Sequence, residues 1–477
     1  MFRFNALTTL KFLIFALFIG LIGLSPSLKV IPQGLMAISL HDSQRLVELL
    51  FIGVILLESI TFRNNTSSIT INNNIRYTLY VLIALAIVSS CLAISPRHAI
   101  IETSLFAGLT YLALYVARSY SDNSTQLIKR LTYVFWGGIL LSMLAFYVGY
   151  ITATIFKTPV TWPAPITGFN NVRLFNQYQL WTLGLILLPI LSFDFKNAHS
   201  RYWLHLGLIC WWVILFHTAS RGVLLAWGLG ILITALIYRK LAWPFIRLHL
   251  IHITSGFLSY TILFKLIPFL RETSVVTGTI VRETTSDRIA LWSQSINLIQ
   301  NHPIFGIGPM HFAWYSPISA HPHNSVLQIM MEWGMPAALL IFAFAIYGLF
   351  FWLKKINIAT LQSKTSHDRN LAIILFFTVV TNAAYSLLDG VIVMPISQIM
   401  MFTFIGLMLG YYYKCNAPKA HRIKRGSFFS HLFPSVVLIA LILSILPEVL
   451  QNASGDEKRF SIGYTAMGPR IWLEFKQ

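Results

Sequence analysis

Charged residues are scarce in this chain of 477 residues: 35 are basic and 16 are acidic, which together make 11% of the sequence. Ordinary soluble domains carry about 25% charged residues. Hydrophobic residues make up 56% of the chain, which is far more than a disordered chain contains. The composition therefore excludes both a water-soluble globule and a disordered protein.

Cysteine and two common enzyme motifs are also scarce or missing. The three cysteines, Cys91, Cys210 and Cys415, are far apart and lie in or beside apolar runs, so they predict no disulfide framework and no cysteine metal site. No Asp-x-Asp pair occurs, although nucleotide-sugar transferases commonly use one to hold a metal. No G-x-x-x-x-G-K-[ST] loop occurs either, which argues against a nucleotide-hydrolysing pump.

The apolar residues gather in runs of the length that a membrane helix needs, about 20 residues. We expect an all-α polytopic membrane protein with about 12–13 transmembrane helices, and a single membrane-embedded domain over 1–477. The predicted spans are 12–25, 46–62, 77–96, 99–117, 131–153, 178–193, 203–217, 222–238, 249–268, 326–352, 370–388, 391–413 and 431–448. The first run resembles a signal peptide, but no A-x-A-like cleavage site follows it, and we expect it to be retained.

The basic residues set the orientation of these spans. The net charge of +19 would suggest a nucleic-acid partner in a soluble protein. Here the basic residues lie in short segments between apolar runs, so we expect membrane lipids and no nucleic acid. If the N-terminus is cytoplasmic, nearly every basic cluster falls inside, as the positive-inside rule requires. The connection 269–325 and the tail 449–477 then lie outside.

Several arginines break this rule. Arg271, Arg282 and Arg288 lie in the long outer connection, and Arg173 and Arg221 lie at the outer ends of neighbouring spans. Exceptions to the rule are frequent, and snorkelling at the interface would account for each residue. The functional alternative is that they bind an anion at the outer face, because guanidinium forks bind phosphate oxygens through two parallel hydrogen bonds.

The outer connection is predicted to be structured. Ser286 and Asp287 are typical of a helix start. An apolar face follows at helical spacing, formed by Ile289, Trp292, Ile296 and Ile299. Pro303 marks the helix end, and Gly306 and Gly308 allow tight turns. Such a helix could lie on the membrane surface, cap a cavity or pack onto the bundle. Trp162, Trp292 and Trp314 all fall near the predicted outer interface. Most of them are expected to be residues of the aromatic belt, and one or two could stack on sugar rings.

His323 lies where this connection re-enters the membrane. A lone histidine at a helix end is usually a capping or packing residue. The four histidines of the connection could also suggest a metal: His302, His311, His321 and His323. Zinc sites favour i, i+4 helical pairs or close cysteine and histidine sets. Pro322 separates the last two histidines, so we expect no metal and no other cofactor.

The same segment carries a family resemblance. His323 and Asn324, followed by nine residues and then Gly334, resemble the signature of the O-antigen ligase and polymerase superfamily. Ala337 stands where that signature has Gly, Thr or Tyr. RIALWSQSINLIQNHPIFGIGPMHF resembles the family's stretch from an arginine to a Pro-rich turn and a G-x-G. HTASRGVLLAW resembles its Ser-Arg-Gly helix start.

The resemblance implies an inverting glycosyltransferase of the bacterial inner membrane with its active site at the periplasmic face. The donor would be a glycan on undecaprenyl pyrophosphate, and the acceptor a hydroxyl of lipid A-core. Alternative acceptors are a growing glycan, as in a polymerase, or a protein, as in a protein O-oligosaccharyltransferase. The alternative of another class is a transporter of the same lipid-linked sugars, which predicts ionisable residues inside the spans.

The resemblance also implies roles for single residues. Arg221 and Arg288 match the family's functional arginines, and His323 would be the catalytic base or would position the acceptor hydroxyl. Imidazole is available in its neutral form near pH 7. Substrate contacts are expected from Arg173, Arg282, Asn324 and Asp389, and structural roles from Gly306, Gly308 and Gly334. Asp389 could orient His323 or Arg221, or could be an ordinary turn aspartate before Gly390.

Overall fold

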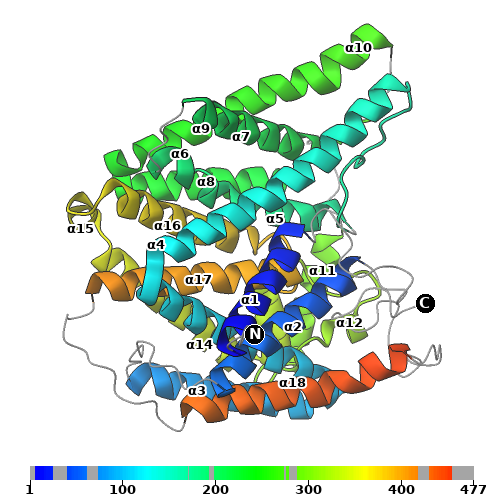
Figure 1. The fold of residues 1–477 in the computed structure, drawn as a ribbon. Helices are drawn as coiled ribbons and strands as arrows, with labels where there is room; N and C mark the ends of the chain where they lie inside the picture. The colour runs from blue at the N-terminus through cyan, green and yellow to red at the C-terminus, as the bar shows by residue number, and fades with distance from the viewer. Residues whose placement is uncertain are drawn as a thin grey trace, which may run out of the picture.

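The computed structural model describes residues 6–24, 40–61, 73–169, 171–192, 198–272, 275–278, 287–416 and 429–453. Within these ranges the chain is helical, and the only β-type pairing is one isolated bridge between Val160 and Val275. Figure 1 shows the long helices stacked as one bundle. The expected all-α polytopic membrane fold is confirmed.

The helices follow the chain in this order. They are α1 (Ala6–Phe18), η1 (Ile19–Leu24), α2 (Leu40–Thr61), α3 (Asn73–Leu92), α4 (Pro96–Ile155), α5 (Val172–Leu185), α6 (Leu188–Ser192), α7 (Ala198–Thr218), α8 (Arg221–Tyr238), η2 (Arg239–Ala242), α9 (Trp243–Thr261), η3 (Ile262–Leu266), α10 (Ile267–Arg271), α11 (Arg288–Asn301), α12 (Phe312–Tyr315), α13 (Ser325–Trp333), α14 (Met335–Lys355), α15 (Ile358–Gln362), α16 (Ser366–Tyr385), α17 (Pro395–Asn416) and α18 (Phe429–Ala453).

The predicted spans fall on helices, but some of them join into one helix, and 178–193 and 326–352 are each divided between two helices. Among the described residues, six continuous helical stretches are long and apolar enough to cross a membrane. Helix α4 has 60 residues and contains two predicted spans, with a break at Asn123 (φ −151°, ψ 78°). The stretch Arg221–Arg271 also contains two, separated only by the 3₁₀ turn η2.

The predicted span 326–352 is wrong at its start, because the chain breaks at Gly334. Helix α13 ends there and α14 begins at Met335. Gly334 has φ +84°, and a Cβ at this position would lie 2.1 Å from the carbonyl oxygen of Ile304. Only glycine accepts that backbone at low cost. Short α13 is therefore a separate element that supports the site, and α14 alone has the length and composition of a span.

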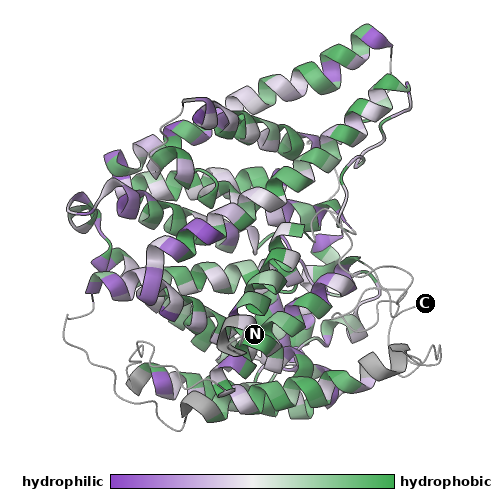
Figure 2. Cartoon of the chain, viewed as in Figure 1, coloured by the Kyte–Doolittle hydropathy of each residue, from purple (hydrophilic) through white to green (hydrophobic). Residues whose placement is uncertain are grey.

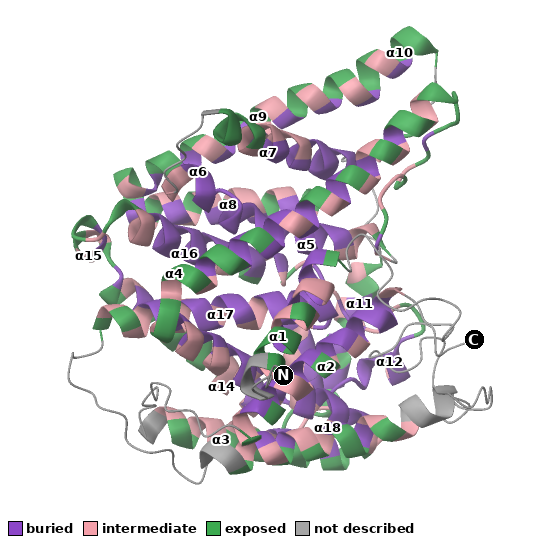
Figure 3. Ribbon diagram, in the orientation of Figure 1, coloured by how far each residue is buried: buried purple, intermediate pink, exposed green. Residues whose placement is uncertain are grey.

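Apolar side chains cover the outside of the bundle. Figure 2 shows the long helices green over much of their length, and Figure 3 shows exposed residues along α14 and α18. Polar residues are buried instead: Arg45 bonds to Glu48 at 2.6 Å, and both side chains are almost fully buried. A lipid environment favours this distribution. Apolar side chains gain no hydrophobic free energy by leaving lipid, whereas polar groups inside the bundle must pair with one another.

The connections lie at the two ends of the long helices. Figure 1 shows α15 at one end and α11 and α12 at the opposite end. Helix α16 packs against α5 and α8, and α11 packs against α13. These contacts bring segments that are far apart in the sequence to the end of the bundle where α11 lies.

Candidate active site

The candidate site is built around a pair formed by His323 and Asp389. The imidazole Nδ1 lies 3.0 Å from Asp389 Oδ1. The histidine side chain keeps 13% of its surface exposed, whereas that of the aspartate keeps 4%. Asp389 therefore lies behind His323 and is shielded from solvent.

The partners of Asp389 fix the tautomer of this histidine. The carboxylate accepts hydrogen bonds from Gly390 N at 2.8 Å and from the Tyr385 hydroxyl at 2.9 Å. An ionised carboxylate only accepts, so His323 Nδ1 must carry the proton that it donates. The lone pair of the imidazole is then on Nε2, the nitrogen that a base needs on its other side.

The charge on Asp389 is stabilised locally. Burial opposes its ionisation, but the hydrogen bond and positive field of His323, the field of His321 and the Gly390 N–H together lower the pKa of Asp389 to about 2. The carboxylate is thus charged throughout the neutral range and acts as a hydrogen-bond acceptor for the imidazole.

Arg288 interacts electrostatically with Asp389 and with two further arginines. Burial lowers the pKa of Arg288, the field of Asp389 raises it, and the fields of Arg173 and Arg221 lower it. Arg173, Arg221 and Asp389 therefore all lie within electrostatic reach of Arg288. Arg288 Nε is buried and has no hydrogen-bond partner among the described residues. The cluster carries excess positive charge and an unused donor, which favours an anionic ligand.

The ends of four helices reinforce this charge. Arg173 lies in the first turn of α5, and Arg221 and Arg288 are the first residues of α8 and α11. Helix α13 begins directly after His323, with Asn324 as its N-cap. A helix N-terminus carries partial positive charge and unpaired N–H groups, and it attracts phosphate.

Left-handed backbone occurs in three of the site segments. His323 has φ +54°, Asp287, directly before Arg288, has φ +59°, and Ala219, two residues before Arg221, has φ +54°. Such a conformation costs roughly 1–3 kcal/mol at a residue other than glycine, and it persists where the surroundings enforce it. Three such positions next to three predicted functional residues are typical of an active site.

Asn324 holds α13 against the end of α16. Its side chain accepts hydrogen bonds from Val326 N and Leu327 N and donates one to Leu387 O at 3.2 Å. Ser325 N also donates to Ser386 O at 2.8 Å. The structure therefore gives Asn324 a capping position, and these bonds bring His323 next to Asp389.

The predicted glycines form the turn behind the site. Gly306 (φ +70°) and Gly308 (φ +98°) take left-handed conformations. Ile307 N and Gly308 N donate to the carbonyls of Met331 and Glu332 at the end of α13. The segment that follows α11 is thus joined to the helix that positions His323.

One prediction at this site is wrong, and another lies outside the described residues. Asp287 was predicted as an acid in the first turn of α11, but it occupies the N-cap position instead, with a left-handed backbone and no side-chain capping bond. Arg282 and Ser286 fall outside the described part of the chain. Sequence reasoning missed Tyr385, which binds Asp389 from one turn earlier in the chain. The i, i+4 spacing of the two residues was the available signal.

One set of side chains could hold a metal ion. Ligand atoms of His321, His323 and Asp389 all lie within 4.8 Å of one another. His311 is in a different position, because Nε2 accepts from Ser95 N at 2.9 Å and Nδ1 lies 2.7 Å from Pro309 O. Both ring nitrogens of His311 are thus used in fixing the fold.

Taken together, the fold and the site define a polytopic membrane protein with a histidine–carboxylate pair beside a cluster of arginines. Residues 206–342 match the family model described as O-antigen ligase, so this stretch carries the domain of a glycosyltransferase-type family. The resemblance drawn from His323, Asn324 and Gly334 is confirmed at the level of the family. A search of curated proteins found no match.

Proposed function

We propose that the protein transfers a glycan from undecaprenyl pyrophosphate to an acceptor hydroxyl at the periplasmic face, with inversion, and that the acceptor is lipid A-core. The observation that carries this proposal is the electrostatic coupling of Arg288 to Arg173, Arg221 and Asp389. Asp389 is hydrogen-bonded to His323, so the groups that would bind a diphosphate lie close to a candidate base. Transfer from a lipid-linked sugar diphosphate needs both a diphosphate-binding group and a base.

The step follows from this geometry. His323 Nε2 takes the proton of the acceptor hydroxyl while that oxygen attacks the anomeric carbon. The bond from that carbon to the diphosphate oxygen breaks, and the diphosphate leaves with the electron pair. The three arginines compensate its developing charge. Asp389 holds the imidazole and stabilises the imidazolium, and a single displacement inverts the anomeric carbon.

We further propose that the reaction needs no metal. Asp389 and His323 Nδ1 are engaged with each other, and arginine supplies the positive charge that a cation would otherwise supply. Purified enzyme should keep its activity after exhaustive chelation. Activity lost on chelation and restored by a divalent ion would instead assign His321, His323 and Asp389 to a metal.

Two experiments test the reaction and its acceptor. His323→Ala and Arg288→Ala should each lower transfer in membranes by about 100-fold or more while the protein level persists, and full activity in both variants would reject the assignment. A deletion strain then identifies the acceptor by the product that is lost. Lost capping of lipopolysaccharide supports ligation, lost long polymer supports a polymerase, and lost glycoprotein supports a protein O-oligosaccharyltransferase.

A further inference from the structure

Helix α11 covers only part of its predicted apolar face. The side chains that it buries are Leu291, Ser295, Leu298 and Ile299. Ile289 and Ile296 of that face are 65% and 48% exposed. A helix next to the candidate site thus leaves two isoleucines of an apolar stripe exposed.

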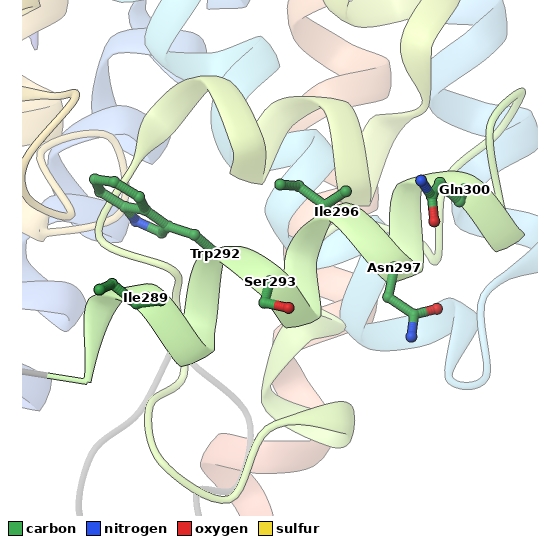
Figure 4. Close-up of a pocket in the computed structure, with 6 residues that line it drawn as sticks. All are labelled: Ile289, Trp292, Ser293, Ile296, Asn297 and Gln300. Carbon is green, nitrogen blue, oxygen red and sulfur yellow. The ribbon is translucent and has the colours of Figure 1, made fainter.

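This stripe lines a groove of about 520 Å³, within the usual range of ligand pockets of about 300–1,000 Å³. Figure 4 shows the lining side chains along one side of α11. They are Ile289, Trp292, Ser293, Ile296, Asn297 and Gln300. The groove follows α11 from Ile289 to Gln300, a length of roughly 17 Å at 1.5 Å per residue.

The position of the groove links it to the catalytic centre. It begins at Ile289, the residue after Arg288. The Trp292 indole N–H donates to Pro322 O at 3.0 Å, which anchors the ring to the residue before His323. The groove therefore lies beside the segments that carry Arg288 and His323.

The lining has the chemistry of sugar recognition. It offers an aromatic ring with apolar neighbours for the C–H faces of a pyranose, and a hydroxyl and two amides for its hydroxyl groups. It contains no charged side chain, in contrast to the arginine cluster beside it. Lipid tails fit this surface poorly, because Ser293, Asn297 and Gln300 would lose water without gaining hydrogen-bond partners.

We infer that this groove binds the sugar rings of a glycan substrate beyond the ring that reacts. This inference rests on the proposed glycosyl transfer and adds to it where the rest of the glycan lies. Donor and acceptor glycans share the chemistry that the groove recognises. Steady-state kinetics in which donor and acceptor are varied in turn distinguish the two sources. In a variant of the groove, only the KM of the substrate whose glycan occupies the groove should rise.

The first experiment compares donors of different length. Undecaprenyl diphosphate carrying one sugar is compared with the donor carrying the full glycan, for wild type, Asn297→Ala and Gln300→Ala. Losing one hydrogen bond should lower the ratio of kcat/KM for the long donor over the short donor by up to about tenfold. If the acceptor glycan fills the groove, the same fall is expected in the ratio of kcat/KM for the long acceptor over the truncated acceptor. Gln362→Ala, an exposed helical amide on α15, is the matched control.

The second experiment measures binding without catalysis. The glycan released by mild acid from the producing cells, which carries neither lipid nor diphosphate, is titrated against His323→Ala protein in nanodiscs. Binding should persist in His323→Ala and should fall by at least tenfold when Trp292→Ala or the groove-filling Ser293→Phe is added. If these two variants fail to fold, glycan binding is measured for the milder Gln300→Ala variant instead.

The outcomes separate this inference from the proposed function. Glycan binding that is unaffected by the groove variants would overturn the subsite. Equal losses with short and long substrates would also overturn it and would indicate that α11 contacts the membrane surface instead. If wild type transfers no glycan while His323→Ala still binds it through the groove, the subsite stands and the proposed reaction is wrong.

Discussion

Asp389 provides the sharpest test of the catalytic pair, because its two oxygens have different partners. Oδ1 accepts from His323 and Gly390, and Oδ2 accepts from the Tyr385 hydroxyl. In Asp389→Asn the amide oxygen can take the place of Oδ1, and its NH₂ can donate to the tyrosine oxygen. The tautomer of His323 is then kept, and only the negative charge is lost. Asp389→Ala removes the anchor altogether.

The expected magnitudes follow from these bonds. A hydrogen bond to a charged group contributes about 1.5–3 kcal/mol, so Asp389→Ala should lower kcat by roughly 10- to 100-fold. A neutral bond is worth about half as much, so Asp389→Asn should lose roughly five- to tenfold. His323→Ala should lose about 10²–10⁴-fold, the usual contribution of general base catalysis.

The decisive assay combines the substitutions. Initial rates of glycan transfer are measured in nanodiscs for both single variants and for His323→Ala/Asp389→Ala. If Asp389 acts through His323, the double variant is no slower than His323→Ala alone. Additive losses would refute the reasoning. Asp368→Asn, near the other end of α16, serves as the control and should keep nearly full activity.

Four further predictions follow. Arg221→Lys should raise the donor KM about tenfold in steady-state kinetics, because lysine keeps the charge but loses the fork; an unchanged KM would mean that the charge alone matters. Tyr385→Phe leaves Asp389 Oδ2 short of one donor, so thermal unfolding in detergent should show a loss of about 1–3 kcal/mol, and an unchanged midpoint would exclude this bond. Gly334→Ala forces a left-handed backbone and a Cβ 2.1 Å from a carbonyl oxygen, so its midpoint should fall, whereas Gly228→Ala, which meets nothing within 4 Å, should not change it. The pKa of Asp389 is about 2 in the folded protein and 3.8 ordinarily. Its charge therefore stabilises the fold by about 2 kcal/mol above pH 4, and this stabilisation is lost as the pH falls towards 2. A difference in the free energy of unfolding between wild type and Asp389→Asn that stays constant over that range would contradict this linkage.

The sequence was sufficient to predict the fold class and the residues that lie in a recognisable local motif. Apolar runs predicted the helices, and the segment around His323 predicted the family. The break at Gly334 was not predicted, because an apolar run continues through it and only the close approach of Ile304 requires glycine there. The apolar spacing of α11 left membrane contact, capping of a cavity and packing open, and the packing of Leu291, Leu298 and Ile299 determines which side of the helix is covered.

Long-range pairing was harder to predict than local structure. Asp389 was compatible with a turn residue and with a partner of His323, and the structure gives it both kinds of contact, since it bonds to its own Gly390 N–H and to the imidazole. The two side chains are 66 positions apart, and no local pattern encodes such a contact. Helix packing alone decides it.

The residues of the site come from both sides of the matched stretch 206–342. That stretch supplies Arg221, Arg288 and His323, whereas Arg173 precedes it and Asp389 follows it. A chimaera that received only this stretch from a distant relative would inherit the imidazole without the carboxylate that orients it. This stretch can therefore be exchanged only into a recipient protein that already has an aspartate after α16 in position to bond the transferred histidine.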